Sequence, residues 1–166
     1  MRALRLITAL FLILGLTACG GDSKFRTYNG PPVTKVVVYK DARKMQLFGN
    51  AEILKTYDIA LGFAPKEHKQ FEGDGKTPEG LYYIDRRNPR SRFHLSIGIS
   101  YPNKDDIAYA KAQGKDPGGE IFIHGRTGHK GDNNGDWTWG CIAVTDRQME
   151  DIYAMVREGT PIYIHP

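Results

Sequence analysis

The sequence predicts a mostly β domain, a sandwich or barrel built from short strands with one or two helices. Apolar and β-branched residues occur in short runs, and clusters of Gly, Pro, Asn and Asp separate these runs. Only two stretches carry the signals of a helix. No internal repeat is visible, and the length does not require a second domain.

Seven strands are expected from these runs. In one of them Phe93, Leu95, Ile97 and Ile99 alternate with smaller or polar residues, which is typical of a strand buried on one face only. The expected strands cover Val33–Tyr39, Met45–Phe48, Ala51–Leu61, Leu81–Ile84, Phe93–Ile99, Glu120–His124 and Ile162–Ile164.

Two helices are expected. Asn103 can cap a short helix over Asp105–Gln113, which Gly114 would end. A second helix is expected near residues 146–158, because Thr145 and Gln148 form a capping box. Apolar residues of this helix fall at helical spacing, at Met149, Ile152, Tyr153 and Val156. Two helix breakers, Gly159 and Pro161, would end it.

The N-terminus has the pattern of a bacterial lipoprotein signal peptide. Arg2 and Arg5 precede an apolar run from Leu6 to Leu16, which is shorter than the ~20 residues that a membrane-spanning helix needs. The following Leu-Thr-Ala-Cys resembles a lipobox, so we expect cleavage after residue 18 and a diacylated Cys19. The alternative is an ordinary cleaved signal with an incidental thiol.

This pattern divides the chain into a signal peptide (1–18), a lipidated Cys19 with a flexible tether (19–32) and one domain (33–166). We therefore expect an exported, periplasmic protein held at a membrane by its lipid, and Gly20 is compatible with the outer membrane. Without Arg2 and Arg5 the formal net charge falls from +4 to +2, which gives nucleic-acid binding no support.

Cysteine is scarce for an exported chain, since only Cys19 and Cys141 occur. If Cys19 carries lipid, Cys141 has no partner within the chain. An unpaired thiol outside the cytoplasm is prone to oxidation, which favours a chemical role for Cys141 over a structural one.

His124 is the expected partner of that thiol. It follows a predicted strand, and Cys141 comes seventeen residues later, after a glycine-rich stretch. A cysteine nucleophile is only partly ionised at neutral pH and profits from an imidazole that takes its proton. Gly140 allows close approach of a substrate, and the amides of Gly140 and Cys141 could bind an oxyanion.

The pair lies within a motif, His-Gly followed by Thr-Trp-Gly-Cys-Ile, that resembles the catalytic signature of the L,D-transpeptidase (YkuD-type) family. The upstream Thr77-Pro78-Glu79-Gly80 is similar to the Thr-Pro-x-Gly segment of that family, about fifty residues before the first motif. The resemblance spans roughly Val33 to Pro166. It implies the β-sandwich domain of the family, a periplasmic or cell-surface location, peptidoglycan as substrate and a part in cell-wall biogenesis and cell shape.

For individual residues the resemblance implies that Cys141 is the nucleophile and His124 the base, with Gly125 orienting the histidine and Thr138 matching a family Ser/Thr. The thiolate would attack the third residue of a stem tetrapeptide, expel D-alanine and form a thioester. Another stem peptide, a lysine of a wall-attached protein or water would then resolve it. The reaction needs no cofactor and no metal ion.

Two positions depart from the more familiar family pattern, which has His before Gly-Cys and Arg shortly after it. Here Trp139 and Ala143 occupy those positions, so a titratable ring and a substrate-binding cation are missing. Arg126 or Arg147 could replace the cation. Trp137 and Trp139 could stack on a substrate or pack in the core.

Several alternatives stay open at this point. A peptidoglycan amidase or carboxypeptidase would use the same residues, and a non-catalytic wall-binding lipoprotein would keep only the fold. A sortase-like enzyme is disfavoured by the short interval between His124 and Cys141, and a papain-like peptidase by the order of its residues. The Asp132–Asp136 run lacks the glutamate that a calcium loop requires, so we expect a surface turn there.

Overall fold

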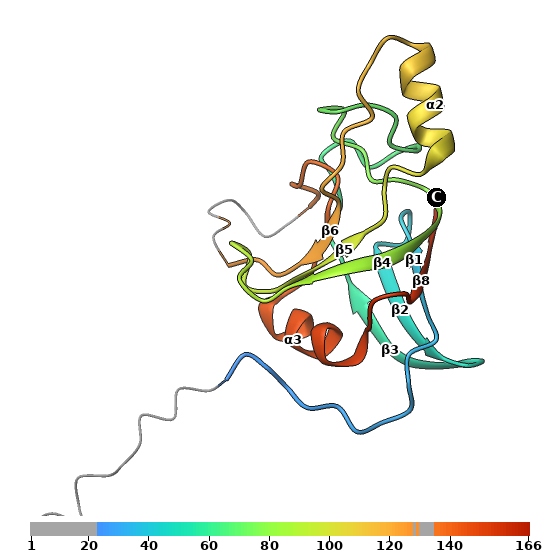
Figure 1. The fold of residues 1–166 in the computed structure, drawn as a ribbon. Helices are drawn as coiled ribbons and strands as arrows, with labels where there is room; N and C mark the ends of the chain where they lie inside the picture. Colours follow the sequence, from blue (N-terminus) through green and yellow to red (C-terminus); the bar gives the residue numbers. More distant parts are fainter. Residues whose placement is uncertain (1–22, 128, 130–134) are drawn as a thin grey trace, which may run out of the picture.

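The computed structural model describes residues 23–127, 129 and 135–166 (Figure 1). The predicted signal peptide, Cys19 and most of the Asp132–Asp136 run lie outside the described residues. One eight-stranded sheet forms the body of the molecule, in the order β3-β2-β1-β8-β4-β5-β6-β7. Its strands are β1 (Lys35–Tyr39), β2 (Lys44–Gly49), β3 (Glu52–Asp58), β4 (Gly80–Asn88), β5 (Ser96–Ile99), β6 (Phe122–His124), β7 (Ile142–Ala143) and β8 (Pro161–His165).

The sheet curls because β4 belongs to both of its halves. The first residues of β4 pair with β8 and the later ones with β5, and the register shifts between Ile84 and Arg86. At the far edges, the chain after β3 returns to the other end of the sheet, where Ala60 and Ala143 exchange backbone hydrogen bonds of 2.8 and 2.9 Å. The expectation of a mostly β sandwich or barrel is confirmed, in the form of one curled sheet.

The strand predicted over Phe93–Ile99 differs most from expectation. Only Ser96–Ile99 is extended, and all four residues are buried, so the prediction of a strand with one exposed face is wrong. Helix α3 contacts β5. The Arg86 side chain covers Gly98, where an added Cβ would clash with it. Small residues at alternate positions therefore marked close packing rather than an exposed face.

Both predicted helices are present, and they lie at opposite ends of the molecule (Figure 1). Helix α2 (Lys104–Ala112) has the predicted Asn103 cap. Helix α3 (Asp146–Met155) begins at the predicted Thr145 and Gln148 capping box but ends three residues before the expected residue 158. The Arg87 guanidinium binds the carbonyls of Tyr153 and Val156, and this contact from the neighbouring strand takes up the last acceptors of the helix.

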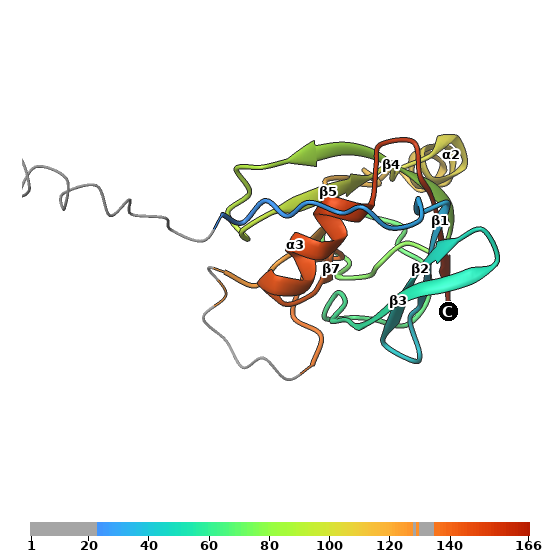
Figure 2. The ribbon, with the colours of Figure 1, turned by 90° about the horizontal axis from the view of Figure 1, so that it is seen from below.

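The hydrophobic core includes residues of both α3 and the curled sheet, beside which the helix lies in Figure 2. Fully buried Met149 and Ile152 of α3 belong to the same cluster as strand residues such as Ile97 and Ile123. Within the described ranges, no helix is both long and apolar enough to span a bilayer.

Residues 23–32 lack regular secondary structure, but they lie against the domain. Lys24 Nζ donates to the Pro89 and His94 carbonyls, and Arg26 forms ion pairs with Glu150 and Asp151 of α3. The part of the predicted tether that the structure describes is therefore docked on the domain.

Candidate active site

Cys141 lies at the turn that leads into β7. Gly140, directly before it, has φ of +123°, a conformation that glycine adopts without steric cost. The half-buried sulfur accepts from the Phe122 amide at 3.4 Å, and the thiol donates to the Glu120 carbonyl at 3.5 Å. The start of β6 therefore holds the thiol from one side.

His124 ends β6 and is 3 % exposed. Its Nδ1 lies 2.6 Å from the Gly125 carbonyl oxygen. Because a carbonyl oxygen only accepts, this contact assigns the proton to Nδ1 and leaves the lone pair of Nε2 available. Phe93 stacks on the imidazole at 4.5 Å between ring centroids, and Trp137 meets it edge-on at 5.7 Å. The ring is held in one orientation before substrate binds.

The two side chains line the same hollows. Cys141 and His124 both line a cavity of about 460 Å³ next to the β4–β5 loop and a second cavity of about 490 Å³ next to Trp137 and Trp139. The thiol donates to Glu120 in the described structure, so its proton reaches Nε2 only after the side chain turns or a substrate binds. Such hydrogen bonds commonly tighten only in the substrate complex.

Burial disfavours charge on both groups. It lowers the pKa of His124, against the opposing effect of the Gly125 hydrogen bond. Burial raises the pKa of Cys141, while the Phe122 amide and the positive charge of Lys69 oppose that rise. At neutral pH the pair is therefore an imidazole and a thiol, and His124 would have to take the proton as the sulfur attacks.

Thr138 holds the backbone of the Gly-Cys turn. Its Oγ1 donates to the Cys141 carbonyl at 2.6 Å and accepts from the Gly140 amide at 3.1 Å. The sequence predicted two amides as oxyanion donors, and this contact engages the one from Gly140. Of the two expected donors, the Cys141 amide is the one that this contact leaves available, and its oxyanion role stays a prediction.

The chain after His124 is fixed by Asp146, the first residue of α3. Asp146 accepts from the Arg126 and Thr127 amides at 2.6 and 3.0 Å and from the Thr127 hydroxyl. Burial alone would raise the pKa of Asp146, but these hydrogen bonds outweigh it and lower the pKa. A Cβ at Gly125 would clash with Asp146 and with the Phe93 carbonyl, so this position requires glycine.

Packed backbone from Gly62 and residues 69–77 lies behind Cys141, and we call this region the floor. A Cβ at Gly140 would lie 2.5 Å from the Lys76 carbonyl oxygen, and a Cβ at Gly62 would overlap the Gly75 carbonyl. The Gly62 amide also donates to Thr77 Oγ1 at 3.2 Å. The backbone just before the Thr-Pro-x-Gly motif therefore lies against the Gly-Cys turn, and Thr77 of the motif binds Gly62 beside it.

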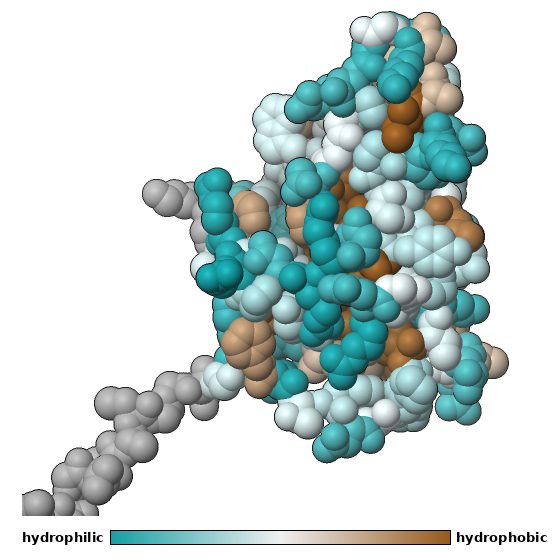
Figure 3. Space-filling view, in the orientation of Figure 1, coloured by the Kyte–Doolittle hydropathy of each residue, from teal (hydrophilic) through white to brown (hydrophobic). Residues whose placement is uncertain are grey.

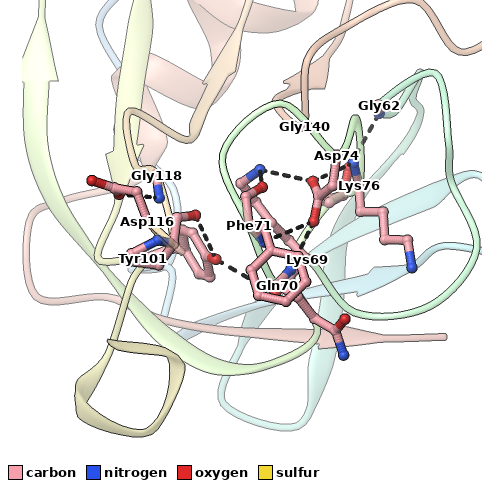
Figure 4. Close-up of polar contacts among 12 residues, drawn as sticks. Gly62, Lys69, Gln70, Phe71, Asp74, Lys76, Tyr101, Asp116, Gly118 and Gly140 are labelled. Atoms are coloured by element: carbon pink, nitrogen blue, oxygen red, sulfur yellow. Dashed lines mark hydrogen bonds and ion pairs between the residues drawn. The ribbon is translucent and has the colours of Figure 1, made fainter. Parts of the chain in front are cut away.

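Asp74 ties the floor together (Figure 4). Its carboxylate accepts from three backbone amides, at 2.8 to 3.0 Å, and from Lys69 Nζ at 2.9 Å; the amides are those of Gln70, Phe71 and Lys76. Burial alone would raise the pKa of Asp74, but these contacts outweigh it and lower the pKa. Lys69, itself 2 % exposed, lines a cavity of about 430 Å³ together with Cys141.

The two arginines proposed to replace the missing cation lie elsewhere. Arg126 lines a cavity with Arg43 and Asp136 that includes neither Cys141 nor His124. Arg147 is exposed on α3 and lines none of the three cavities at the cysteine. The geometry therefore gives no support to a substrate-binding role for either arginine, and that role stays a prediction.

The two tryptophans differ in their surroundings. Trp137 packs against His124 and also stacks on His129 at 3.8 Å between ring centroids. Trp139 is 70 % exposed and meets Phe63 edge-on at 4.9 Å. Trp137 is thus placed to orient the histidine, and Trp139 is placed to meet a substrate.

Asp136 is the last residue of the run considered as a calcium loop. Its carboxylate pairs with Arg43 at 2.7 Å and accepts from the Leu61 amide at 2.7 Å. Across the residues with described positions, no cluster of three or more His, Cys, Asp or Glu could hold a metal ion.

The sequence did not indicate three of the residues that shape the site. Phe93 was assigned to a strand, while the structure places its ring on His124. Lys69 and Asp74 precede the Thr-Pro-x-Gly segment, and their pairing depends on a loop conformation that no local pattern shows. The only available signal was the Gly-Asp-Gly sequence at 73–75, which is typical of a tight turn.

Comparison with known proteins agrees with this geometry. Residues 34–164 match the family model described as YkuD, the L,D-transpeptidase catalytic domain. The chain is 30 % identical over 173 residues to YafK of Escherichia coli (strain K12), a match that covers 94 % of this chain and 64 % of that protein. The chain therefore spans less than two thirds of this relative's length.

Two solved structures are also similar. The helical cell shape determining protein Pgp2 from Campylobacter jejuni superposes with a TM-score of 0.64 and 27 % identity, over 87 % of this chain and 51 % of Pgp2. Bd1075 from Bdellovibrio bacteriovorus superposes with a TM-score of 0.58 and 25 % identity, over 80 % of this chain and 48 % of Bd1075. The similarity in each case covers about half of a longer protein.

Proposed function

Because the chain belongs to the family of L,D-transpeptidase catalytic domains, we propose that it is a cysteine acyltransferase acting on the stem peptides of peptidoglycan. One observation carries this proposal. The Nδ1 proton of His124 is committed to the Gly125 carbonyl, which leaves Nε2 as a base in a cavity that Cys141 also lines. A structural histidine and a buried structural cysteine would not need to line the same cavity.

In the first half-reaction, Sγ of Cys141 attacks the carbonyl carbon of the third residue of a stem tetrapeptide, and Nε2 of His124 takes the thiol proton. The Cys141 amide donates to the oxyanion of the tetrahedral intermediate. Collapse of the intermediate breaks the peptide bond to D-alanine. His124 returns its proton to the leaving nitrogen, and a thioester remains on Cys141.

In the second half-reaction, an acceptor attacks the thioester carbonyl and gives its proton to His124. Sγ leaves as the thiolate and takes the proton back. An amine acceptor gives a cross-link to another stem peptide or to a lysine of a wall protein, and water gives a trimmed tripeptide. Amidase or carboxypeptidase activity thus differs from transpeptidation only in the acceptor or the donor bond.

Carbapenem acylation tests the nucleophile. Incubation of the purified protein with a carbapenem should add one adduct mass on Cys141 by intact-protein mass spectrometry, and Cys141→Ala should show none. We expect His124→Gln to slow acylation by about 10²–10⁴-fold. His165→Gln changes an exposed histidine at the C-terminal end of β8 and should leave the rate unchanged.

Digestion of sacculi separates the acceptors. New dimers indicate amine acceptors, shortened stems indicate water, and release of attached protein indicates cleavage of such links. Absence of any adduct, together with sacculus binding that survives Cys141→Ala, would favour the non-catalytic wall-binding protein and overturn the proposal.

We further propose that the protein is exported and anchored by lipid at Cys19, on the basis of the sequence pattern alone. Metabolic labelling with a palmitate analogue should mark the wild-type protein and not Cys19→Ser. Labelling that persists in Cys19→Ser would contradict the anchor without affecting the proposed chemistry.

A further inference from the structure

Three cavities meet at Cys141, and their linings differ in chemistry. One is lined largely by aromatic rings, including Phe93 and Trp139. A second combines glycine backbone with Lys69 and carboxylates such as Glu72. The third, of about 460 Å³, lies beneath the loop between β4 and β5. A donor peptide and an acceptor can therefore approach the sulfur along chemically distinct paths.

The third cavity carries two arginines, Arg90 and Arg92, on the segment from Asn88 to Phe93, which we call the rim. Both side chains are exposed, and neither has an ion pair or side-chain hydrogen bond recorded within the described parts of the chain. The preceding arginines are already engaged. Arg86 pairs with Glu120 at 3.2 Å, and Arg87 binds the end of α3.

The rim is held in place by its backbone and short side chains. Lys24 Nζ donates to the carbonyls of Pro89 and His94, which lie on either side of the two arginines, at 2.7 and 3.0 Å. Asn88 Oδ1 accepts from the Arg90 amide, and Ser91 Oγ accepts from the Phe93 amide. The backbone that carries the guanidinium groups is thus ordered, while the groups themselves stay available.

Hydrophilic side chains also cover this end of the molecule on the face shown in Figure 3, where the β4–β5 loop turns. The arginine of the familiar family pattern is absent, because Ala143 stands in its place and is fully buried in β7. The strand therefore supplies no cation at this position, whereas the rim places two arginines on the lining of a cavity that Cys141 shares.

We propose that Arg90 and Arg92 bind the free α-carboxylate of the D-amino acid that leaves when the thioester forms. This inference rests on the proposed acyl transfer. Guanidinium groups match the planar geometry of a carboxylate and bind it in a bidentate manner. The terminal carboxylate is the one charge that the leaving residue carries, so the rim selects stems that end in a free D-amino acid.

Paired donor peptides test the inference. One is a stem tetrapeptide ending in a D-alanine carboxylate, and the other is the same peptide ending in the carboxamide. Acyl-enzyme formation by each peptide is followed by intact-protein mass spectrometry, and kcat/KM is compared. We expect the wild-type protein to prefer the carboxylate and Arg90→Gln/Arg92→Gln to reduce that preference by about tenfold.

Arg157→Gln is the matched control, because Arg157 is exposed and lies outside the three cavities. The two peptides differ in the chemistry of their leaving groups, and this difference is the same for every variant. It therefore cancels when the ratio of the two kcat/KM values is compared between variants. A preference that is unchanged in the double variant, or no preference in the wild-type protein, would overturn the inference and leave the acyl transfer intact. Failure of both peptides to acylate the wild-type protein would instead count against the proposed function.

Discussion

The floor and the rim line different cavities at the same sulfur and are built in opposite ways. In the floor, Asp74 accepts hydrogen bonds from Lys69 and from three amides, and glycine backbones lie in direct contact. On the rim, the backbone is held by hydrogen bonds, while the exposed side chains of Arg90 and Arg92 bind no side chain among the described residues. The first region fixes where the nucleophile lies, and the second is suited to meet a substrate.

This difference has a consequence for mutagenesis. Changes in the floor should reduce stability first and activity as a result. Changes at exposed positions break no packed contact, so they should leave stability unchanged. Where they have an effect, it should be on substrate preference.

Asp74→Ala should have the largest effect. The substitution leaves the ammonium group of Lys69 buried without its carboxylate and frees three amides, which should cost about 3–5 kcal/mol of unfolding free energy. Chemical denaturation measures this loss. Asp58→Ala removes a solvent-exposed ion pair with Lys44 and should cost at most about 1 kcal/mol.

The Asp74 effect should depend on pH with a definite sign. Since the folded-state pKa of Asp74 is lowered, its contribution is complete above the unfolded-state pKa of about 3.9 and is lost as pH falls toward the folded-state pKa. The stability difference between wild type and Asp74→Ala should therefore shrink below about pH 4. A difference that grows on acidification would contradict this assignment.

Gly140→Ala should come second. The side chain would force a positive φ on alanine and press against the Lys76 carbonyl, with an expected cost of about 3 kcal/mol and a large loss of carbapenem acylation. Gly159→Ala is a useful comparison, because Gly159 also has a positive φ but an added Cβ meets nothing within 4 Å. Equal losses of acylation in the two variants would show that floor contact is unimportant.

The pH dependence of acylation should show a smaller effect. Because burial lowers the pKa of His124, the acid limb of the rate profile should have its midpoint below 6.5. Phe93→Ala opens one face of the imidazole to water and should move that midpoint upward. A wild-type midpoint at or above 6.5 would argue against a buried neutral imidazole as the base.

Trp139→Ala should have the smallest effect on stability, within about 0.5 kcal/mol, because the indole is 70 % exposed. Trp137→Ala should cost clearly more, because its ring packs on His124. Thermal unfolding of the two variants compares them directly. Similar losses of stability in the two variants would mean that the exposure of a tryptophan does not determine its contribution to stability here.

Local signals predicted much of this molecule from sequence. The Asn103 cap and the Thr145 and Gln148 capping box depend on residues a few positions apart, and both occur as expected. Short apolar and β-branched runs predicted all of the strands except β7 (Ile142–Ala143). His124 and Cys141 were found because a motif marked both, and the structure places them in the same cavities.

The failures have a different origin, because each depends on a contact between distant segments. The carbonyls at the end of α3 bind Arg87, some seventy residues away along the chain, and buried β5 contacts that helix. The stacking of Phe93 on His124 and the pairing of Lys69 with Asp74 likewise follow from the folded loops. The periodicity of apolar residues within one segment does not indicate which distant segments will pack against it.

The contact among Gly62, Gly75 and Gly140 bears on how related chains evolve. A side chain at Gly62 would overlap the Gly75 carbonyl, one at Gly75 would meet the Phe63 ring, and one at Gly140 would meet the Lys76 carbonyl. Because a different neighbour blocks each position, a substitution at any of the three should require a compensating change in that neighbour. A descendant that keeps the cysteine but has lost one of the glycines is a good candidate for a pseudoenzyme.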